Sequence, residues 1–206
     1  MRAQRPGKIV CVGRNYRAHA AELGNEVPKE PLLFLKPPSS VIASGDAIVL
    51  PAASTQVEFE GEIGVVVGAR LKGASESEAR AAVASIVALN DVTARDLQRS
   101  DGQWTRAKGF DTFCPIGEAV DPPGDLQTLT VTTRVNDTVR QSGRAADMVF
   151  PIPVLLAYIS RIMTLEPSDC VATGTPSGVG RLSPGDVVEV AVGGSVVRNE
   201  VMGGKG

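Results

Sequence analysis

The stretch Val57-Glu58-Phe59-Glu60-Gly61-Glu62-Ile63-Gly64-Val65-Val66-Val67-Gly68 places three glutamates at alternate positions directly before an apolar, β-branched run. Val, Ile and Phe favour strands, and successive side chains on a strand point to opposite faces. We therefore expect a strand that carries Glu58, Glu60 and Glu62 on one face, with neighbouring Cα atoms of the three about 7 Å apart. The apolar residues between and after them then face the opposite side.

Three carboxylates on one face of a strand repel one another, and burial strengthens that repulsion. Such a face is therefore either exposed to solvent at a strand edge or compensated by cations. The alternation alone does not separate these two interpretations, so the rest of the chain has to decide between them.

Length and composition indicate one β-rich domain. The chain has 206 residues, 43% of them apolar and 21% charged, which is ordinary for a globular protein and enough for a sizeable core. Aromatic residues make up 4%, whereas there are 22 glycines and 14 prolines, a combination that favours short strands and turns over long helices. No repeat or linker divides the chain, so residues 1–206 are expected to form a single domain.

Charge and cysteine content exclude several classes of protein. The net charge of −2 and the pI of about 5.5 provide no electrostatic surface for nucleic acid. No apolar run approaches the roughly 18 residues of a membrane span, and the first residues lack the apolar core of a signal peptide, so we expect a cytoplasmic protein. Three widely separated cysteines argue against a disulfide framework, and a single histidine argues against a zinc site of His and Cys.

The periodicity of apolar residues places the expected elements. Strands are expected over 8–13, 32–36, 47–50, 84–89, 129–137, 187–192 and 196–201, with a turn at Asn136 and Asp137. Helices are expected over 16–23, 76–83 and 151–163, the second of them capped by Ser75. Residues 24–31 and 99–113 are expected to be irregular, and residues 171–180 form a small-residue loop that could offer N–H groups to an anion.

Several charged residues stand where chemistry is commonly placed. Asp91 follows a buried strand, where it could serve a site or cap a short helix from Val92. Lys36, at the end of a strand, is either solvated or positioned at the mouth of a pocket, and Lys108 is either solvated or held beside carboxylates. His19 and Glu22 are three apart on the expected helix, so they form either a weak surface pair or an imidazole general base oriented by a carboxylate.

Glu60, Glu62 and Asp91 together offer three carboxylate donors without imidazole or thiolate. Such a set suits a hard cation, Mg²⁺ first, with Mn²⁺ and Ca²⁺ as alternatives. Three protein ligands leave coordination positions for a substrate that chelates, and a small 2-oxo acid does this through its carboxylate and ketone oxygens.

Six segments together make the chain similar to the fumarylacetoacetate hydrolase family, and most similar to its short branch of acylpyruvases, fumarylpyruvate hydrolases and oxaloacetate decarboxylases. They follow the family's order across about residues 8–201 and are Cys11-Val-Gly-Arg-Asn-Tyr-Arg-Ala-His19-Ala-Ala-Glu22, Phe34-Leu-Lys36-Pro, Glu58-Phe-Glu60-Gly-Glu62, Asn90-Asp91-Val-Thr-Ala-Arg95-Asp96-Leu-Gln98, Ala107-Lys108-Gly-Phe110 and Thr173-Gly174-Thr175-Pro176-Ser-Gly178-Val-Gly180. The resemblance implies an α+β, β-rich fold, a mixed β-sandwich roll with a few flanking helices. It also implies a homodimer and a cytosolic or mitochondrial enzyme of 2-oxo acid or aromatic-degradation metabolism.

The resemblance also implies roles for individual residues. The metal ligands would be Glu60, Glu62 and Asp91, with Glu58 outside the ligand set because the family varies there. The other implied residues are the catalytic Lys108 and the dyad His19 and Glu22, the substrate contacts Gln98, Gly174 and Thr175, and the weaker carboxylate contacts Arg14, Tyr16 and Lys36.

This charge placement predicts metal-dependent cleavage of a carbon–carbon bond in a 2-oxo acid through a stabilised enolate. An acylpyruvate would be hydrolysed by water that the histidine dyad activates, whereas oxaloacetate would lose carbon dioxide without such a water. Keto–enol or double-bond isomerisation uses the same enolate and is the alternative activity, extending to 2-hydroxydienoates. A non-catalytic protein that binds a small diacid is the alternative from another class.

Overall fold

The computed structural model describes residues 6–22 and 26–204, apart from the side chains of residues 19–21. Two five-stranded sheets form its centre. The first has the order β2 (Leu32–Lys36), β1 (Ile9–Gly13), β12 (Cys170–Ala172), β6 (Gly61–Val67), β7 (Val83–Asn90). The second has the order β11 (Thr138–Arg144), β10 (Thr130–Val135), β14 (Val187–Val192), β15 (Ser195–Gly203), β4 (Ile48–Leu50). Most neighbours are antiparallel, while β1 with β12 and β15 with β4 are parallel, so both sheets are mixed.

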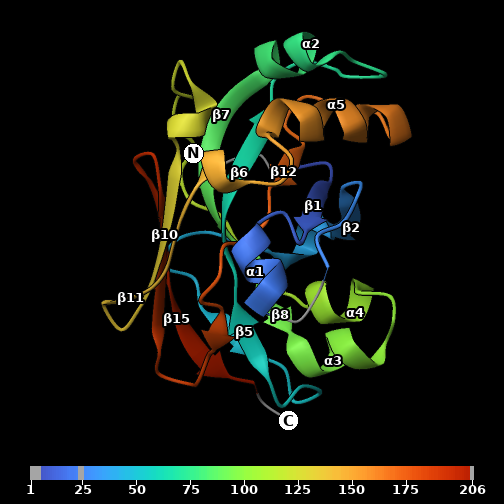
Figure 1. Ribbon diagram of the computed structural model, residues 1–206. Coiled ribbons are helices and arrows are strands. Elements are labelled where there is room, and N and C mark those ends of the chain that lie inside the picture. The colour runs from blue at the N-terminus through green and yellow to red at the C-terminus, as the bar shows by residue number, and fades with distance from the viewer. Residues whose placement is uncertain (1–5, 23–25, 205–206) are drawn as a thin grey trace.

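Smaller strands and short helices complete the fold. β5 (Val57–Phe59) pairs with β13 (Gly180–Arg181) and β8 (Thr93–Ala94), and β3 (Val41–Ile42) pairs with β9 (Cys114–Pro115). The helices are α1 (Arg17–Glu22), α2 (Glu76–Ala81), α3 (Arg95–Ser100), α4 (Thr105–Lys108) and α5 (Ile152–Ile162). Figure 1 shows α2 and α5 together at one end of the sheets and α3 and α4 at the other. None of the helices within residues 6–22 and 26–204 has the length and apolar character needed to cross a membrane.

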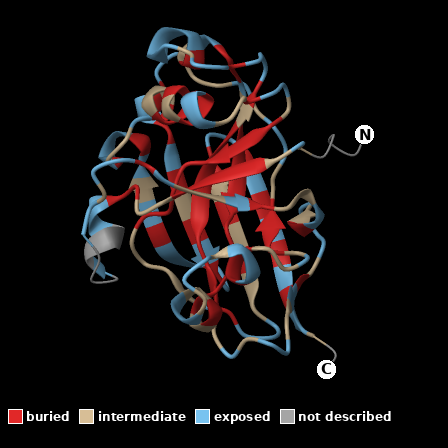
Figure 2. Ribbon diagram, turned by 90° about the vertical axis from the view of Figure 1, so that its right-hand side faces the viewer, coloured by how far each residue is buried: buried red, intermediate tan, exposed pale blue. Residues whose placement is uncertain are grey.

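The main core lies between the inner faces of the two sheets and under α5. Val65 and Ile86 from the first sheet, Val131 and Val190 from the second, and Leu156 from α5 are all buried there. Figure 2 shows the buried residues gathered along these central strands. A second cluster, which includes Phe59, Leu97 and Phe113, lies beside α3 and α4. The predicted strand-rich α+β fold is confirmed.

The predicted continuous strand over 57–68 was wrong in one respect, because it breaks at Glu60 into β5 and β6. At the break, side chains replace a neighbouring strand as hydrogen-bond partners of the backbone. Asn90 Oδ1 accepts the Glu60 N–H at 3.0 Å, and Gln141 Oε1 accepts the Gly61 N–H at 2.9 Å. The chain therefore leaves one sheet and enters another at the residue that carries the central carboxylate.

Asp91 does not cap a helix from Val92, as one interpretation of the sequence allowed. Residues 93–94 pair with β5 instead, and α3 begins only at Arg95 with Ala94 at its N-cap. Part of the expected irregular segment 99–113 also folds, as the short helix α4, which ends at Lys108. Arg95 therefore begins α3 and Lys108 ends α4, and both side chains bind Glu60, the residue that follows β5.

Several local predictions are confirmed. Asn136 and Asp137 form the hairpin turn, with φ of 50° and 62°, and Ser75 caps α2 in a reciprocal capping box with Glu78. The three cysteines are free and buried, as the absence of a disulfide framework requires.

Candidate active site

Three carboxylates meet where β6 begins and β7 ends. Gly61 pairs with Asn90 in register, and the Asp91 N–H donates to the Glu60 carbonyl at 2.8 Å. Glu60, just before β6, and Asp91, just after β7, therefore lie side by side. One carboxylate oxygen from each of Glu60, Glu62 and Asp91 lies within 4.8 Å of the others. Because their residues are only 5%, 2% and 0% exposed, the three like charges require compensation.

Two buried lysines supply part of that compensation. Lys108 Nζ lies 2.8 Å from Glu60 Oε2 and 2.6 Å from Asp91 Oδ2, and also donates to Thr93 Oγ1 at 2.7 Å. Lys36 Nζ lies 2.6 Å from the other Asp91 oxygen and donates to the Val92 carbonyl at 3.1 Å. Both oxygens of Asp91 are thus held by ammonium groups.

Arg95 compensates the remaining side of the acidic strand. Its Nε donates to Glu58 Oε2 at 2.8 Å, and a second guanidinium nitrogen pairs with Glu60 Oε1. Gln56 donates to the other oxygen of Glu58 at 2.6 Å. The acidic face is therefore buried and paired with cations, which decides between the two interpretations that the sequence left open.

The pKa of Glu62 is raised well above its usual value, by burial first and then by the charges of Asp91 and Glu60. The Gly174 N–H, 2.7 Å from Glu62 Oε2, and the charge of Lys108 act in the opposite direction. Burial alone would lower the pKa of Lys108, but the charges of Asp91 and Glu60 outweigh it and raise this pKa, so the ammonium stays protonated.

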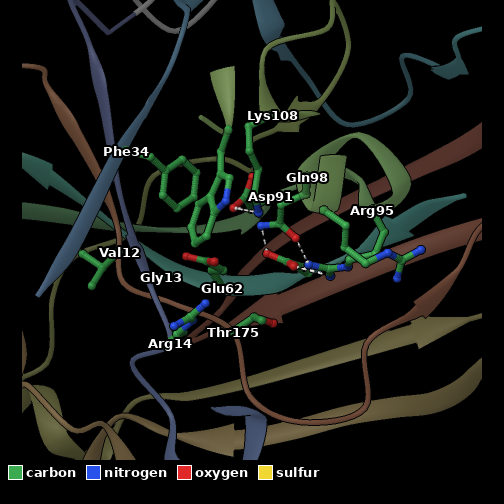
Figure 3. Close-up of a pocket in the computed structure, with 13 residues that line it drawn as sticks. Val12, Gly13, Arg14, Phe34, Glu62, Asp91, Arg95, Gln98, Lys108 and Thr175 are labelled. Atoms are coloured by element: carbon green, nitrogen blue, oxygen red, sulfur yellow. Dashed lines mark hydrogen bonds and ion pairs between the residues drawn. The ribbon is translucent and has the colours of Figure 1, made fainter. Parts of the chain in front are cut away.

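The carboxylates open onto a cavity of about 300 Å³ (Figure 3). Phe34 and Trp104 form an aromatic wall, with ring centroids 5.2 Å apart in an edge-to-face arrangement. Lys108 Nζ lies 4.9 Å from the centre of the Phe34 ring, which helps to fix the ammonium. A side chain at Gly13 would approach Trp104 to 3.0 Å, so the glycine leaves room for the indole. The full lining is Val12, Gly13, Arg14, Phe34, Glu60, Glu62, Asp91, Arg95, Gln98, Arg99, Trp104, Lys108 and Thr175.

Arg14, Gln98, Thr175 and Lys108, which the sequence singled out, all line this cavity. Arg14 has a positive φ of 58°, a conformation that a residue with a side chain rarely adopts without support. The neighbouring Asn15 supplies that support, since its side chain donates to the Thr173 carbonyl and accepts from the Phe150 N–H, both at 2.8 Å.

Three other predicted substrate contacts, Gly174, Lys36 and Tyr16, are not among the residues that line the cavity. Gly174 holds Glu62 through its N–H, and its φ of 101° suits a glycine. Lys36 is buried against Asp91 and is not a solvated strand end. Tyr16 is 3% exposed, and its hydroxyl has no hydrogen-bond partner within the described part of the chain.

The predicted dyad lies on α1. Glu22 accepts the Gly178 N–H at 3.1 and 3.2 Å, which attaches the end of this helix to the glycine loop after β12. The backbone of His19 is helical, but its side chain lies outside the described residues. The catalytic role of the pair therefore stays a prediction.

Sequence reasoning missed the cations that α3 contributes to the site. Arg95, Gln98 and Arg99 all line the cavity from α3, and only Gln98 had been assigned a role. Their spacing of three and four residues, which puts them on one face of a helix, was the available signal. Trp104 and Thr93 had no signal of this kind.

The donor set fits a hard divalent cation. Three carboxylates converge, and Glu62 has one oxygen bound by Gly174, while the other has no hydrogen-bond partner among the described residues. Oxygen donors alone suit Mg²⁺, Mn²⁺ or Ca²⁺ better than softer metals. Glu60, Glu62 and Asp91 are thus the residues that could hold such an ion.

Several curated proteins are similar to the chain over nearly its whole length. It is 42% identical to the mitochondrial oxaloacetate decarboxylase of Dictyostelium discoideum over 91% of this chain and 89% of that protein. It is also 42% identical to the mitochondrial oxaloacetate tautomerase FAHD1 of Arabidopsis thaliana, over 91% and 86% of the two chains. The 2,4-didehydro-3-deoxy-L-rhamnonate hydrolase of a Sphingomonas species is 42% identical over 90% and 70%.

Solved structures of similar sequence share the fold of this chain. The 5-carboxymethyl-2-hydroxymuconate delta-isomerase of Mycobacterium smegmatis superposes with a TM-score of 0.91 at 40% identity, covering 98% of this chain and 81% of that one. Fumarylpyruvate hydrolase of Pseudomonas aeruginosa, solved in complex with Mn²⁺ and pyruvate, gives a TM-score of 0.91 at 29% identity, covering 97% and 91%. The family described as fumarylacetoacetate (FAA) hydrolase C-terminal matches residues 8–202. The chain therefore belongs to the fumarylacetoacetate hydrolase family.

Proposed function

We propose that this protein cleaves a carbon–carbon bond in a small 2-oxo acid, by hydrolysis of an acylpyruvate such as fumarylpyruvate, by decarboxylation of oxaloacetate, or by both. The observation that carries the proposal is the convergence of Glu60, Glu62 and Asp91 within 4.8 Å on a cavity that also exposes cationic side chains. The named relatives, which include a hydrolase and a decarboxylase, support the same chemistry.

A divalent cation held by the three carboxylates, Mg²⁺ first, would polarise the 2-oxo group and favour the enolate that bond cleavage produces. Lys108 adds a fixed positive charge on the same side of the cavity, oriented by Thr93 and by the Phe34 ring. Arg95 holds Glu60 in place, because it binds the oxygen of Glu60 that Lys108 does not.

The two forms of cleavage differ in their need for a base. Hydrolysis of an acylpyruvate requires a water to be deprotonated, which we assign to His19 oriented by Glu22. Decarboxylation requires no such base, since the electrons of the breaking bond pass directly into the enolate.

Tautomerisation is the second candidate, because proteins named as a tautomerase and an isomerase are 42% and 40% identical to this chain. It would use the same cavity and the same enolate, but a proton would be transferred and the carbon–carbon bond would stay intact. A homodimer, a single catalytic domain and a cytoplasmic location stay predictions beside this proposal.

The test is pyruvate release from acetylpyruvate, fumarylpyruvate and oxaloacetate, with added Mg²⁺ and with EDTA. Turnover should stop with EDTA and return with Mg²⁺ or Mn²⁺. Glu62→Gln should abolish it, whereas Glu166→Gln, at an exposed residue paired with Arg70, should not. Conversion of oxaloacetate between keto and enol forms without pyruvate release would favour the tautomerase, and metal-independent turnover would overturn the proposed site.

A further inference from the structure

One face of α3 extends from the buried carboxylates to the rim of the cavity. Arg95, Gln98 and Arg99 line the cavity from this helix, at positions that share one face. With a rise of 1.5 Å per residue, Arg99 lies about 6 Å further along the axis than Arg95. Arg95 is 4% exposed beside Glu60, whereas Arg99 is exposed, so the face begins at the candidate metal ligands and ends near solvent.

Arg99 is held in place by a neutral group. It donates to Gln56 Oε1 at 2.6 Å, and the amide nitrogen of Gln56 in turn donates to Glu58. Arg95 and Lys108 each pair with carboxylates, but no ion pair forms at Arg99 within the described part of the chain. The guanidinium is thus positioned at the rim, and its charge is left available to a ligand.

The charge of the whole site points to a substrate with two negative groups. The cations that line the cavity are Arg14, Arg95, Arg99 and Lys108, and the carboxylates that line it are Glu60, Glu62 and Asp91. Four cations against three carboxylates leave +1, which a bound divalent cation would raise to +3. A 2-oxo acid with a single carboxylate neutralises one of these charges, whereas a dicarboxylic 2-oxo acid neutralises two.

We propose that Arg99 is a specificity-determining residue that binds a second carboxylate, at the end of the substrate remote from the metal ligands. This inference rests on the proposed function and narrows its substrate class to dicarboxylic 2-oxo acids. A substrate chelated beside Glu60 extends along the face of α3, past Gln98, and places its distal carboxylate at the guanidinium. Arg99 is not required for bond cleavage itself.

The first test measures binding of two inert 2-oxo acids of equal carbon number by calorimetry with Mg²⁺. The probes are 2-oxoglutarate, which carries a distal carboxylate, and 2-oxopentanoate, which does not. The wild-type protein should bind 2-oxoglutarate about tenfold to a hundredfold more tightly, the range expected for a hydrogen bond between charged groups. Arg99→Gln should lose this preference. Arg106→Gln should keep it, because Arg106 pairs with Asp101 and does not line the cavity.

The second test compares kcat/KM for fumarylpyruvate and for acetylpyruvate. Arg99→Gln should lower the value for fumarylpyruvate by at least about tenfold and leave acetylpyruvate within threefold, with partial recovery in Arg99→Lys. Equal effects on the two substrates, or an unchanged binding preference in Arg99→Gln, would overturn the assignment. Absence of turnover by the wild-type protein on every substrate would overturn the proposed function instead, and the binding preference would still decide the role of Arg99.

Discussion

Replacing Lys108 with methionine should make the protein bind a divalent cation more tightly while it loses the proposed activity. The Lys108 ammonium lies 2.8 Å from Glu60 and 2.6 Å from Asp91, so it contacts two of the three candidate metal ligands. A metal ion bound to those carboxylates would be repelled by the ammonium and would compete with it for the oxygens of Glu60 and Asp91. Methionine keeps most of the side-chain volume and removes the charge.

The magnitude follows from the distances. Unit charges about 4 Å apart interact by about 4 kcal/mol at an effective dielectric constant of 20, and a divalent ion roughly doubles this. Because the two carboxylates also repel each other once the ammonium is gone, we expect only part of this gain, a tightening of about tenfold to a hundredfold. The metal-free variant should be destabilised by about 3–5 kcal/mol, since it leaves buried carboxylates without their partner. For a protein of this size that is a fall in Tm of roughly 6–20 °C.

Two assays check the expectation: Mn²⁺ binding by calorimetry, and Tm with and without the ion. The Tm gained on adding Mn²⁺ should be larger for Lys108→Met than for the wild-type protein. Lys72→Met, at an exposed lysine, should behave as the wild type does. Weaker or unchanged Mn²⁺ affinity in Lys108→Met would refute the reasoning, because it would show that the ammonium supports the ion and does not compete with it.

Three further predictions concern the base, the acid and the packing. His19→Ala should remove most hydrolysis of an acylpyruvate and leave Mn²⁺ affinity unchanged, so retained hydrolysis would end the role of the dyad. The raised pKa of Glu62 means that the folded metal-free protein holds this proton more tightly than the unfolded chain does. The Tm of the metal-free protein should therefore fall as pH rises through that raised pKa, and Mn²⁺ should oppose the fall; a Glu62→Gln variant that keeps the same pH dependence would contradict this. Gly64→Ala should cost about 1–3 kcal/mol and lower Tm by roughly 2–12 °C, because its new methyl would lie 2.5 Å from Val87 Cγ2, whereas Gly124→Ala meets nothing and should leave Tm unchanged.

The sequence predicted most of the strands because they depend on local patterns, whereas Asp91 was joined to Glu60 and Glu62 through the family resemblance, since their meeting depends on the pairing of β6 with β7. β-branched runs, the turn at Asn136 and the cap at Ser75 each act within a few residues. The break at Glu60 could not be predicted in this way, since it depends on side chains from 30 and 80 residues further along the chain.

The cationic half of the site was predicted less completely for the same reason. Lys108 was identified as a residue that carboxylates could hold and Lys36 as a charge at the mouth of a pocket, but their shared partner Asp91 depends on the tertiary fold. The pairing of Arg95 with Glu58 also joins elements that are distant in sequence. Charge compensation across strands and helices is therefore visible only in the folded chain.

The chain divides the work of its cavity between two stretches that tolerate change differently. The carboxylates sit at a junction of strands where the backbone is held by β7 and by the side chains of Asn90 and Gln141. Gln98 and Arg99 project from α3, and their hydrogen bonds reach the carboxylates only through Arg95 and Gln56. We expect substitutions on this outer face to change which substrate binds and to leave the arrangement of the three carboxylates unchanged. A cavity divided in this way would let substrate preference change through one helical turn, while the three carboxylates keep their arrangement.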